Sequence, residues 1–181
     1  MGFTADGCLK LFDFGLVTCV RSRQHANDSY SMTGFTGSLR YMAPEVALQE
    51  PYTEKVDVYS FGIMLWQMAK DKVPFQGMTK QDFMENVVMG DLRPKLDKSW
   101  PRGFSNLLTN CWQRNSGSRP SFTMIIQDLD SLIDEETNLN RSSFSNRSVG
   151  SSIYLRRAGA SRRILKMVSL SGGNLFDLPS I

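Results

Sequence analysis

The chain has 181 residues, of which 41% are hydrophobic and 22% charged, a composition typical of a soluble globular protein with one domain and a tail. No apolar stretch approaches the roughly 20 residues of a membrane span, and the three cysteines are an odd number without CxxC spacing. These features indicate neither a disulfide framework nor a cysteine zinc site, they predict no membrane span, and they favour a reducing, cytoplasmic location.

Charge divides the chain into two parts. Residues 1–137 hold 14 Lys/Arg and 17 Asp/Glu, whereas residues 138–181 hold 7 and 1. The basic part is rich in Ser, Arg, Asn and Gly and cannot bury enough apolar surface to offset the entropy of ordering. We therefore interpret 137–181 as a mostly disordered tail. Its arginines suit acidic surfaces, membranes or a basophilic kinase, but a solvated tail is the favoured account and no nucleic-acid partner is expected.

The first elements in chain order are a hairpin and a loop. Residues 1–12 alternate in polarity around an Asp-Gly dipeptide at positions 6–7, which predicts two strands joined by a tight turn. Residues 16–38 show no sustained apolar period and are predicted to form a long loop. A compact domain rarely keeps such a loop unless it is functional.

A central helix is predicted from Glu54 onwards. The segment from Val56 to Met68 is apolar nearly all round, which is typical of a helix buried on every side. Asp57 lies within it, and an unpaired buried carboxylate costs several kcal/mol. We therefore expect Asp57 to be a buried organiser that accepts backbone hydrogen bonds.

Three further helices are predicted at 79–89, 104–112 and 121–133, because their apolar residues recur at helical spacing. Thr79 is placed as the N-cap of the first, three residues before Asp82. Prolines lie between these segments and not inside them. The predicted fold is mainly α, with an N-terminal β-hairpin, and the predicted domain occupies residues 1–136.

Two short motifs give the sequence its functional meaning. Asp13-Phe14-Gly15 follows a predicted strand and opens the long loop, and Ala43-Pro44-Glu45 closes that loop thirty residues later. Phosphoryl-transfer enzymes of the kinase class use this ordered pair. Together with the helical segment 56–62, Cys111-Trp112 and Ser118-Arg119-Pro120-Ser121, these motifs make residues 1 to about 133 resemble a protein kinase.

The resemblance implies a kinase C-terminal lobe, a helical bundle around a buried central helix. Residues 33–45 are similar to the tyrosine-kinase-like branch, which mostly phosphorylates Ser and Thr. Ser38 matches the position where Ser/Thr-specific kinases carry Ser or Thr. Thr33 and Thr36 belong to the same activation segment and are candidates for phosphorylation by an upstream kinase, since a phosphate can order such a loop against Arg.

The resemblance also assigns roles to individual residues. Asp13 is the expected Mg²⁺ ligand, and Phe14 and Gly15 complete the ATP-binding motif as a switch that places or withdraws that carboxylate. Glu45 and Arg119 are implied to form a buried ion pair. With Asp57 they are structural, while protein substrates are the implied partners.

The catalytic residues themselves are missing. No Gly-x-Gly-x-x-Gly loop, Val-Ala-Ile-Lys strand or His-Arg-Asp loop with its Asn occurs in the sequence. Loss of a general base alone typically costs about 10²–10⁴ in rate. Two hypotheses follow: the chain is a fragment of an active Ser/Thr kinase whose catalytic base lies upstream, or it is a non-catalytic docking module that binds a kinase or a substrate.

Overall fold

The computed structural model describes residues 2–5, 9–10, 12–15, 17 and 38–145. The chain forms two compact units, residues 1–18 with 135–181, and residues 19–134. The predicted turn at 6–7, nearly all of the predicted loop at 16–38, and the tail from 146 lie outside the described residues. Each unit is treated by itself below.

The first unit contains the N-terminal hairpin. Strands β1 (Gly2–Phe3) and β2 (Leu9–Lys10) pair antiparallel, with Gly2 opposite Lys10 and Phe3 opposite Leu9. The predicted hairpin is therefore confirmed, and the strand that precedes the Asp-Phe-Gly motif is β2.

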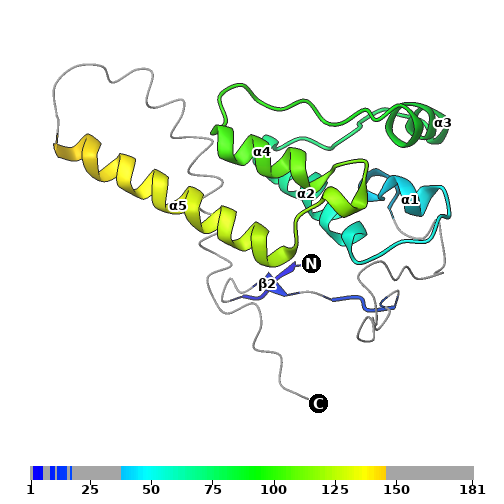
Figure 1. Cartoon of the computed structure of the whole chain (residues 1–181), viewed down its shortest axis with the longest axis horizontal. Helices are drawn as coiled ribbons and strands as arrows, with labels where there is room; N and C mark the ends of the chain where they lie inside the picture. Colours follow the sequence, from blue (N-terminus) through cyan, green and yellow to red (C-terminus); the bar gives the residue numbers. More distant parts are fainter. Residues whose placement is uncertain (1, 6–8, 11, 16, 18–37, 146–181) are drawn as a thin grey trace, which may run out of the picture. The chain divides into compact units, whose positions relative to one another are not determined.

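The second unit is helical. Its elements are η1 (Leu39–Tyr41), α1 (Pro44–Ala47), α2 (Lys55–Lys70), α3 (Lys80–Phe83), the π-helix η2 (Met84–Met89), α4 (Arg102–Cys111), the 3₁₀ helix η3 (Ser116–Ser118) and the first half of α5 (Phe122–Ser145). Helix α2 is the longest element wholly inside this unit, and Figure 1 shows α4 beside it. All four predicted helices are confirmed; their boundaries are displaced by a few residues, except that α5 continues to Ser145.

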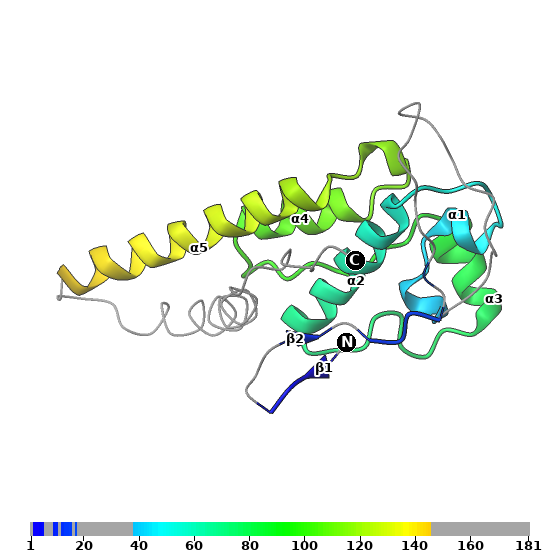
Figure 2. The same cartoon turned by 90° about the horizontal axis from the view of Figure 1, so that it is seen from below.

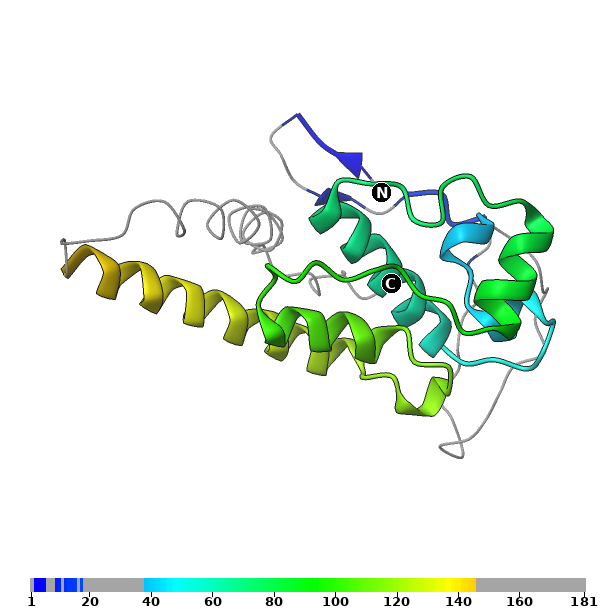
Figure 3. The same ribbon diagram turned by 90° about the horizontal axis from the view of Figure 1, so that it is seen from above.

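The core lies where α2, α4 and the start of α5 meet. Ile63, Phe104 and Leu108 have no exposed surface, and Ile125 is 1% exposed. Helix α4 runs beside the first half of α5 (Figure 3). A Cβ added at Gly103, near the start of α4, would lie 2.8 Å from Leu132 Cδ2 of α5. Helix α1 packs against η2. Figure 2 shows α1 next to α3, the helix that η2 directly follows. The helical core thus forms without any strand from this unit's described residues.

Helix α2 differs from its prediction in one respect. Met68 is 37% exposed, Phe61 and Met64 are half-buried, and Asp57 is exposed. These four residues are spaced three or four apart, so they share one face of the helix. The prediction that α2 is buried on every side is wrong for the described chain. A helix with apolar residues on every face can be buried on every side. Its sequence does not show whether other segments of the chain cover each face.

Helix α5 is longer than its apolar period. It continues to Ser145, so residues 137–145, expected at the start of the tail, are helical. Neither Gly nor Pro occurs between Ile133 and Ser145, and Glu135 and Glu136 are good helix formers. Backbone propensity carries this helix past the point where its buried stripe ends.

A capping box at Thr79 starts α3. The Asp82 backbone N–H donates to Thr79 Oγ1 at 3.1 Å, and the Thr79 backbone N–H donates to Asp82 Oδ2 at 3.0 Å. The hydrogen bond from the Thr79 hydroxyl and then that from its backbone lower the pKa of Asp82. The predicted N-cap is confirmed.

Substitution of this cap gives a first prediction. Thr79→Ala is expected to reduce the free energy of unfolding by about 1 kcal/mol, because an orphan N–H loses its acceptor. Thr79→Ser keeps the hydroxyl and serves as the control in urea denaturation. In an NMR titration the pKa of Asp82 should rise in the Ala variant. Because the pKa of Asp82 is lowered in the folded chain, the stabilisation from its hydrogen bonds with Thr79 is present at neutral pH. This stabilisation is lost as the pH falls and Asp82 becomes protonated. An unchanged Asp82 titration would contradict the capping role.

Candidate functional site

A buried ion pair joins two distant parts of the sequence. Arg119 Nη1 lies 2.5 Å from Glu45 Oε1 and Nη2 lies 2.9 Å from Oε2, although the residues are 74 positions apart. The side chain of Arg119 has no exposed surface, and that of Glu45 is 12% exposed. The two parallel bonds form the bidentate geometry in which guanidinium and carboxylate interact most strongly. The implied Glu45–Arg119 pair is confirmed.

The rest of the guanidinium is also satisfied. Arg119 Nε donates to the Gln113 carbonyl at 2.8 Å and Nη1 donates to the Lys55 carbonyl at 3.0 Å. In return, Lys55 Nζ donates to the Arg119 carbonyl at 2.6 Å. Arg119 thus ties α1, the start of α2 and the loop after α4 together, as a buried cation with several acceptors can.

Tyr59 lies beneath this cluster. Its ring centroid is 5.2 Å from Arg119 Cζ and 5.2 Å from Arg93 Cζ, so both guanidinium groups make cation–π contacts with one ring. Burial raises the pKa of Tyr59 to about 12, so the phenol stays neutral. Sequence reasoning did not single out Tyr59 or Arg93. In the sequence, Tyr59 is one aromatic residue among the apolar residues of a helix, and Arg93 is an arginine before a proline. Neither feature indicates that the two side chains make contact.

The segment before α1 is fastened to α2. Ser60 Oγ donates to the Tyr41 carbonyl at 2.8 Å, and the Tyr41 hydroxyl donates to Gln67 Oε1 at 2.5 Å. Ser38 is exposed at the start of η1, where its carbonyl accepts the Tyr41 N–H at 3.1 Å. Residues 38–42 therefore form a fixed backbone platform with an exposed hydroxyl. Ser60 and Gln67 were missed, although a polar residue inside an apolar helix was the available signal.

Asp57 requires a correction. It is exposed rather than buried, and among the described residues no hydrogen bond to its carboxylate is present. Partial desolvation by the surrounding protein nevertheless raises its pKa. The expected backbone donors are absent from this part of the chain, because the face of α2 that carries Asp57 is left open.

Asp13 lies in the first unit. Its side chain is exposed, its φ of 67° is in the left-handed region that Asp tolerates, and Phe14 is 65% exposed beside it. An exposed carboxylate suits Mg²⁺, which takes hard oxygen ligands and usually keeps waters. The described residues contain no group of three or more His, Cys, Asp or Glu that could hold a metal. Asp13 can therefore offer one ligand, while Thr33 and Thr36 lie outside the described residues.

Comparison with known proteins identifies the family of this chain. Residues 3–129 match the family model described as protein tyrosine and serine/threonine kinase. The chain belongs to the protein kinase family. This kinase domain fragment is mostly helical in its described part, and its ion pair and Asp-Phe-Gly motif lie within the matched region.

Several relatives of this kinase chain are named serine/threonine kinases. It is 38% identical over 124 residues to a probable serine/threonine-protein kinase of Dictyostelium discoideum, covering 68% of this chain and 13% of the relative. It is 35% identical over 130 residues to mitogen-activated protein kinase kinase kinase 12 of Rattus norvegicus, covering 72% and 14%. It is 38% identical over 122 residues to serine/threonine/tyrosine-protein kinase HT1 of Arabidopsis thaliana, covering 67% and 30%. The aligned part is thus under a third of each relative.

Within the part that the structure describes, no helix combines the length and the apolar character needed to cross a bilayer.

Proposed function

We propose that this chain is the C-terminal lobe of a serine/threonine kinase that transfers the γ-phosphoryl group of ATP to Ser or Thr hydroxyls of proteins. The bidentate Glu45–Arg119 pair is the observation that carries the proposal, because it fixes the end of the segment that would receive the substrate. We assign residues 1–136 to the partial kinase domain and 137–181 to a basic tail. A cytoplasmic location goes with this assignment.

The residues of this chain would position the reactants. ATP bound with Mg²⁺ supplies the phosphoryl group and neutralises charge as it transfers. Asp13 would hold the metal through its exposed carboxylate, and Phe14 and Gly15 would set whether that carboxylate is in place. The platform at 38–42 would orient the substrate hydroxyl, with Ser38 favouring Ser/Thr over Tyr. The general base would come from the sequence upstream.

Asp57 would connect this lobe to that upstream sequence. Its carboxylate is exposed on α2 and accepts no hydrogen bond within the described residues. We assign it the role of accepting backbone N–H groups from the preceding segment of a longer product. Thr33 and Thr36 would be the points at which an upstream kinase adds phosphate to the activation segment.

The decisive experiment uses the longer product. The coding DNA upstream of Met1 should contain an in-frame His-Arg-Asp-x-x-x-x-Asn segment, and the extended protein should phosphorylate casein on Ser and Thr. Asp13→Asn should lower this activity by at least about 10²-fold, since a catalytic metal supplies several kcal/mol. Asp130→Asn, at an exposed acid of α5, is the matched control. Equal activity of Asp13→Asn and wild type would refute the proposal.

A second function is favoured by the open face of α2. In this alternative the chain is a non-catalytic module that docks onto a kinase or a substrate. A stop codon upstream of Met1 together with a genuine transcript start would support it. For the 181-residue chain alone, Mg-ATP should leave the melting temperature unchanged under either function, and a clear increase would contradict the view that its nucleotide site is incomplete.

A further inference from the structure

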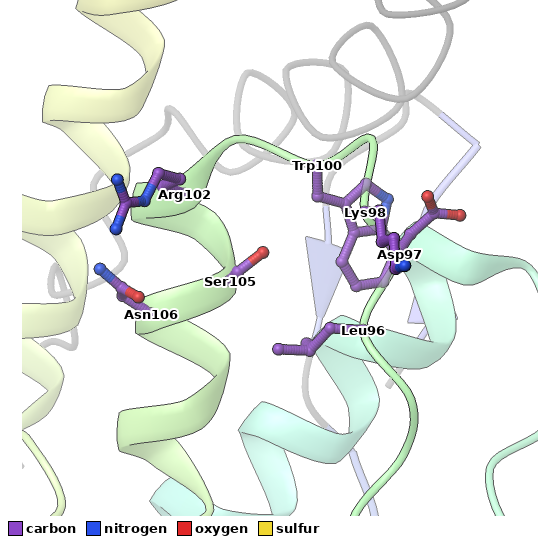
Figure 4. A pocket seen from close by; sticks show the side chains of 7 residues that line it. All are labelled: Leu96, Asp97, Lys98, Trp100, Arg102, Ser105 and Asn106. Carbon is purple, nitrogen blue, oxygen red and sulfur yellow. The ribbon is translucent and has the colours of Figure 1, made fainter.

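A pocket of about 280 Å³ opens beside the first turns of α4. Figure 4 shows Leu96 and Trp100 together on one side and Ser105 pointing toward them from α4. Lys98 and Arg102 lie on opposite sides of the view, Lys98 beside Trp100 and Arg102 beside Asn106. The pocket therefore has an apolar part beside Lys98, with a second cation, Arg102, on the opposite side.

The loop at residues 95–100, which forms one wall of the pocket, is held in place by α2 and α4. Trp66 Nε1 of α2 donates to the Lys95 carbonyl at 3.1 Å. Trp100 is 6% exposed and packs edge to face on Phe104 with ring centroids 5.3 Å apart. Both tryptophans come from buried positions. The apolar part of the pocket is thus preformed, which lowers the entropy cost of binding.

The acid in the pocket is already neutralised. Asp97 Oδ2 accepts from Lys70 Nζ at 2.6 Å, and Asp97 Oδ1 accepts from the Ser99 hydroxyl at 2.7 Å and from the Ser99 N–H at 2.9 Å. The hydrogen bond from Lys70, followed by those from Ser99, holds the pKa of Asp97 well below its usual range. Asp97 therefore contributes little free negative charge to a ligand.

The two remaining charges of the pocket have no counter-ion among the described residues. Lys98 and Arg102 are both exposed, and neither makes an ion pair with another residue of the described chain. Because Lys70 balances Asp97, the pocket carries a net positive charge from these two side chains. Such a charge attracts a ligand with acidic groups.

We propose that this pocket binds a short acidic peptide segment of a partner protein, with an apolar side chain on Leu96 and the small exposed part of Trp100, and acidic residues on either side facing Lys98 and Arg102. Ser105 and Asn106 offer hydrogen bonds to the peptide backbone, and pockets of this kind combine an apolar surface with a few polar groups that fix orientation. Two cations on opposite sides of the pocket match carboxylates that flank an apolar residue. A nucleic-acid backbone would call for a longer run of cations. The proposal is independent of phosphoryl transfer.

The test is fluorescence anisotropy with the whole chain and a labelled peptide, Gly-Ser-Glu-Leu-Glu-Ser-Gly. The acidic peptide should bind about tenfold more tightly than the same peptide with Gln in place of Glu, and the difference should shrink as salt screens the charges. The proposal is overturned by equal binding of the two peptides, or by no binding of the acidic peptide up to about 1 mM.

Variants separate this pocket from other basic surfaces. Lys98→Gln and Arg102→Gln should each weaken binding about threefold and the double variant about tenfold, whereas Lys80→Gln, on α3, should leave it unchanged. Thermal melts should show that all of these variants remain folded. Undiminished binding by the double variant would overturn the proposal. So would full competition by inorganic phosphate at the peptide's own concentration, or binding of phosphatidylserine vesicles through Lys98 and Arg102 in place of the peptide.

Discussion

Glu45→Leu is expected to lower the free energy of unfolding by about 3–5 kcal/mol, because it leaves the guanidinium of Arg119 buried without its carboxylate. That guanidinium has no exposed surface, so water cannot replace the lost partner. Glu45→Gln should cost less, since the amide oxygen can still accept one hydrogen bond. Urea denaturation of the whole chain, followed by circular dichroism, measures both losses.

A double variant tests whether the loss comes from the stranded charge. Glu45→Leu combined with Arg119→Met should be more stable than Glu45→Leu alone, because no buried charge remains. Recovery should be incomplete, since the carbonyls of Lys55 and Gln113 lose their guanidinium donor. Arg102→Met removes an exposed arginine and should change stability by less than about 0.5 kcal/mol. A loss below about 1 kcal/mol for Glu45→Leu would contradict the proposed importance of the pair.

The ion pair marks a limit of sequence reasoning. Glu45 and Arg119 are 74 residues apart, and no local period or spacing brings them together. Only the resemblance to kinases predicted their contact. The helices, by contrast, followed from apolar periodicity and from the Thr79 cap, because local hydrogen bonds and one buried face determine those elements.

Asp57 and Ser60 show why the site was harder to predict than the fold. Both are polar residues in an apolar helix, but the sequence analysis expected hydrogen-bond partners only for Asp57. Ser60 donates to the Tyr41 carbonyl and holds the platform before α1, whereas Asp57 is exposed on the open face. The difference depends on which other segments of the chain reach each side of α2. Helical spacing places a residue on a face, but it does not identify the neighbour on that face.

The crossing of α2 and α4 gives the second large expected effect. A Cβ added at Gly62 would lie 2.6 Å from Cys111 Cβ and 3.7 Å from the Cys111 backbone, so the two helices would have to move apart. Overpacking of this kind typically costs about 1–3 kcal/mol. The higher helix propensity of Ala offsets up to about 1 kcal/mol of this.

Gly103 provides the matched comparison. A Cβ added there would also be close to its neighbour, at 2.8 Å, but that neighbour is the Cδ2 end of the Leu132 side chain, which can rotate. Both glycines lie in helices, so both Ala variants receive a similar gain in propensity. Gly62→Ala should therefore be less stable than Gly103→Ala by about 1–3 kcal/mol in urea denaturation.

Cys111 identifies the atom responsible. Burial raises the pKa of Cys111 to about 12, so the thiol is neutral and its substitution removes no charge. Cys111→Gly removes the Cβ atom that the new Cβ of Gly62→Ala would clash with. Cys111→Gly should therefore lower the free energy of unfolding less in the Gly62→Ala background than in the wild type. Cys111→Ala keeps the Cβ and should give no such relief. Equal effects of the two Cys111 substitutions in both backgrounds would show that close packing at Gly62 does not hold α2 and α4 together.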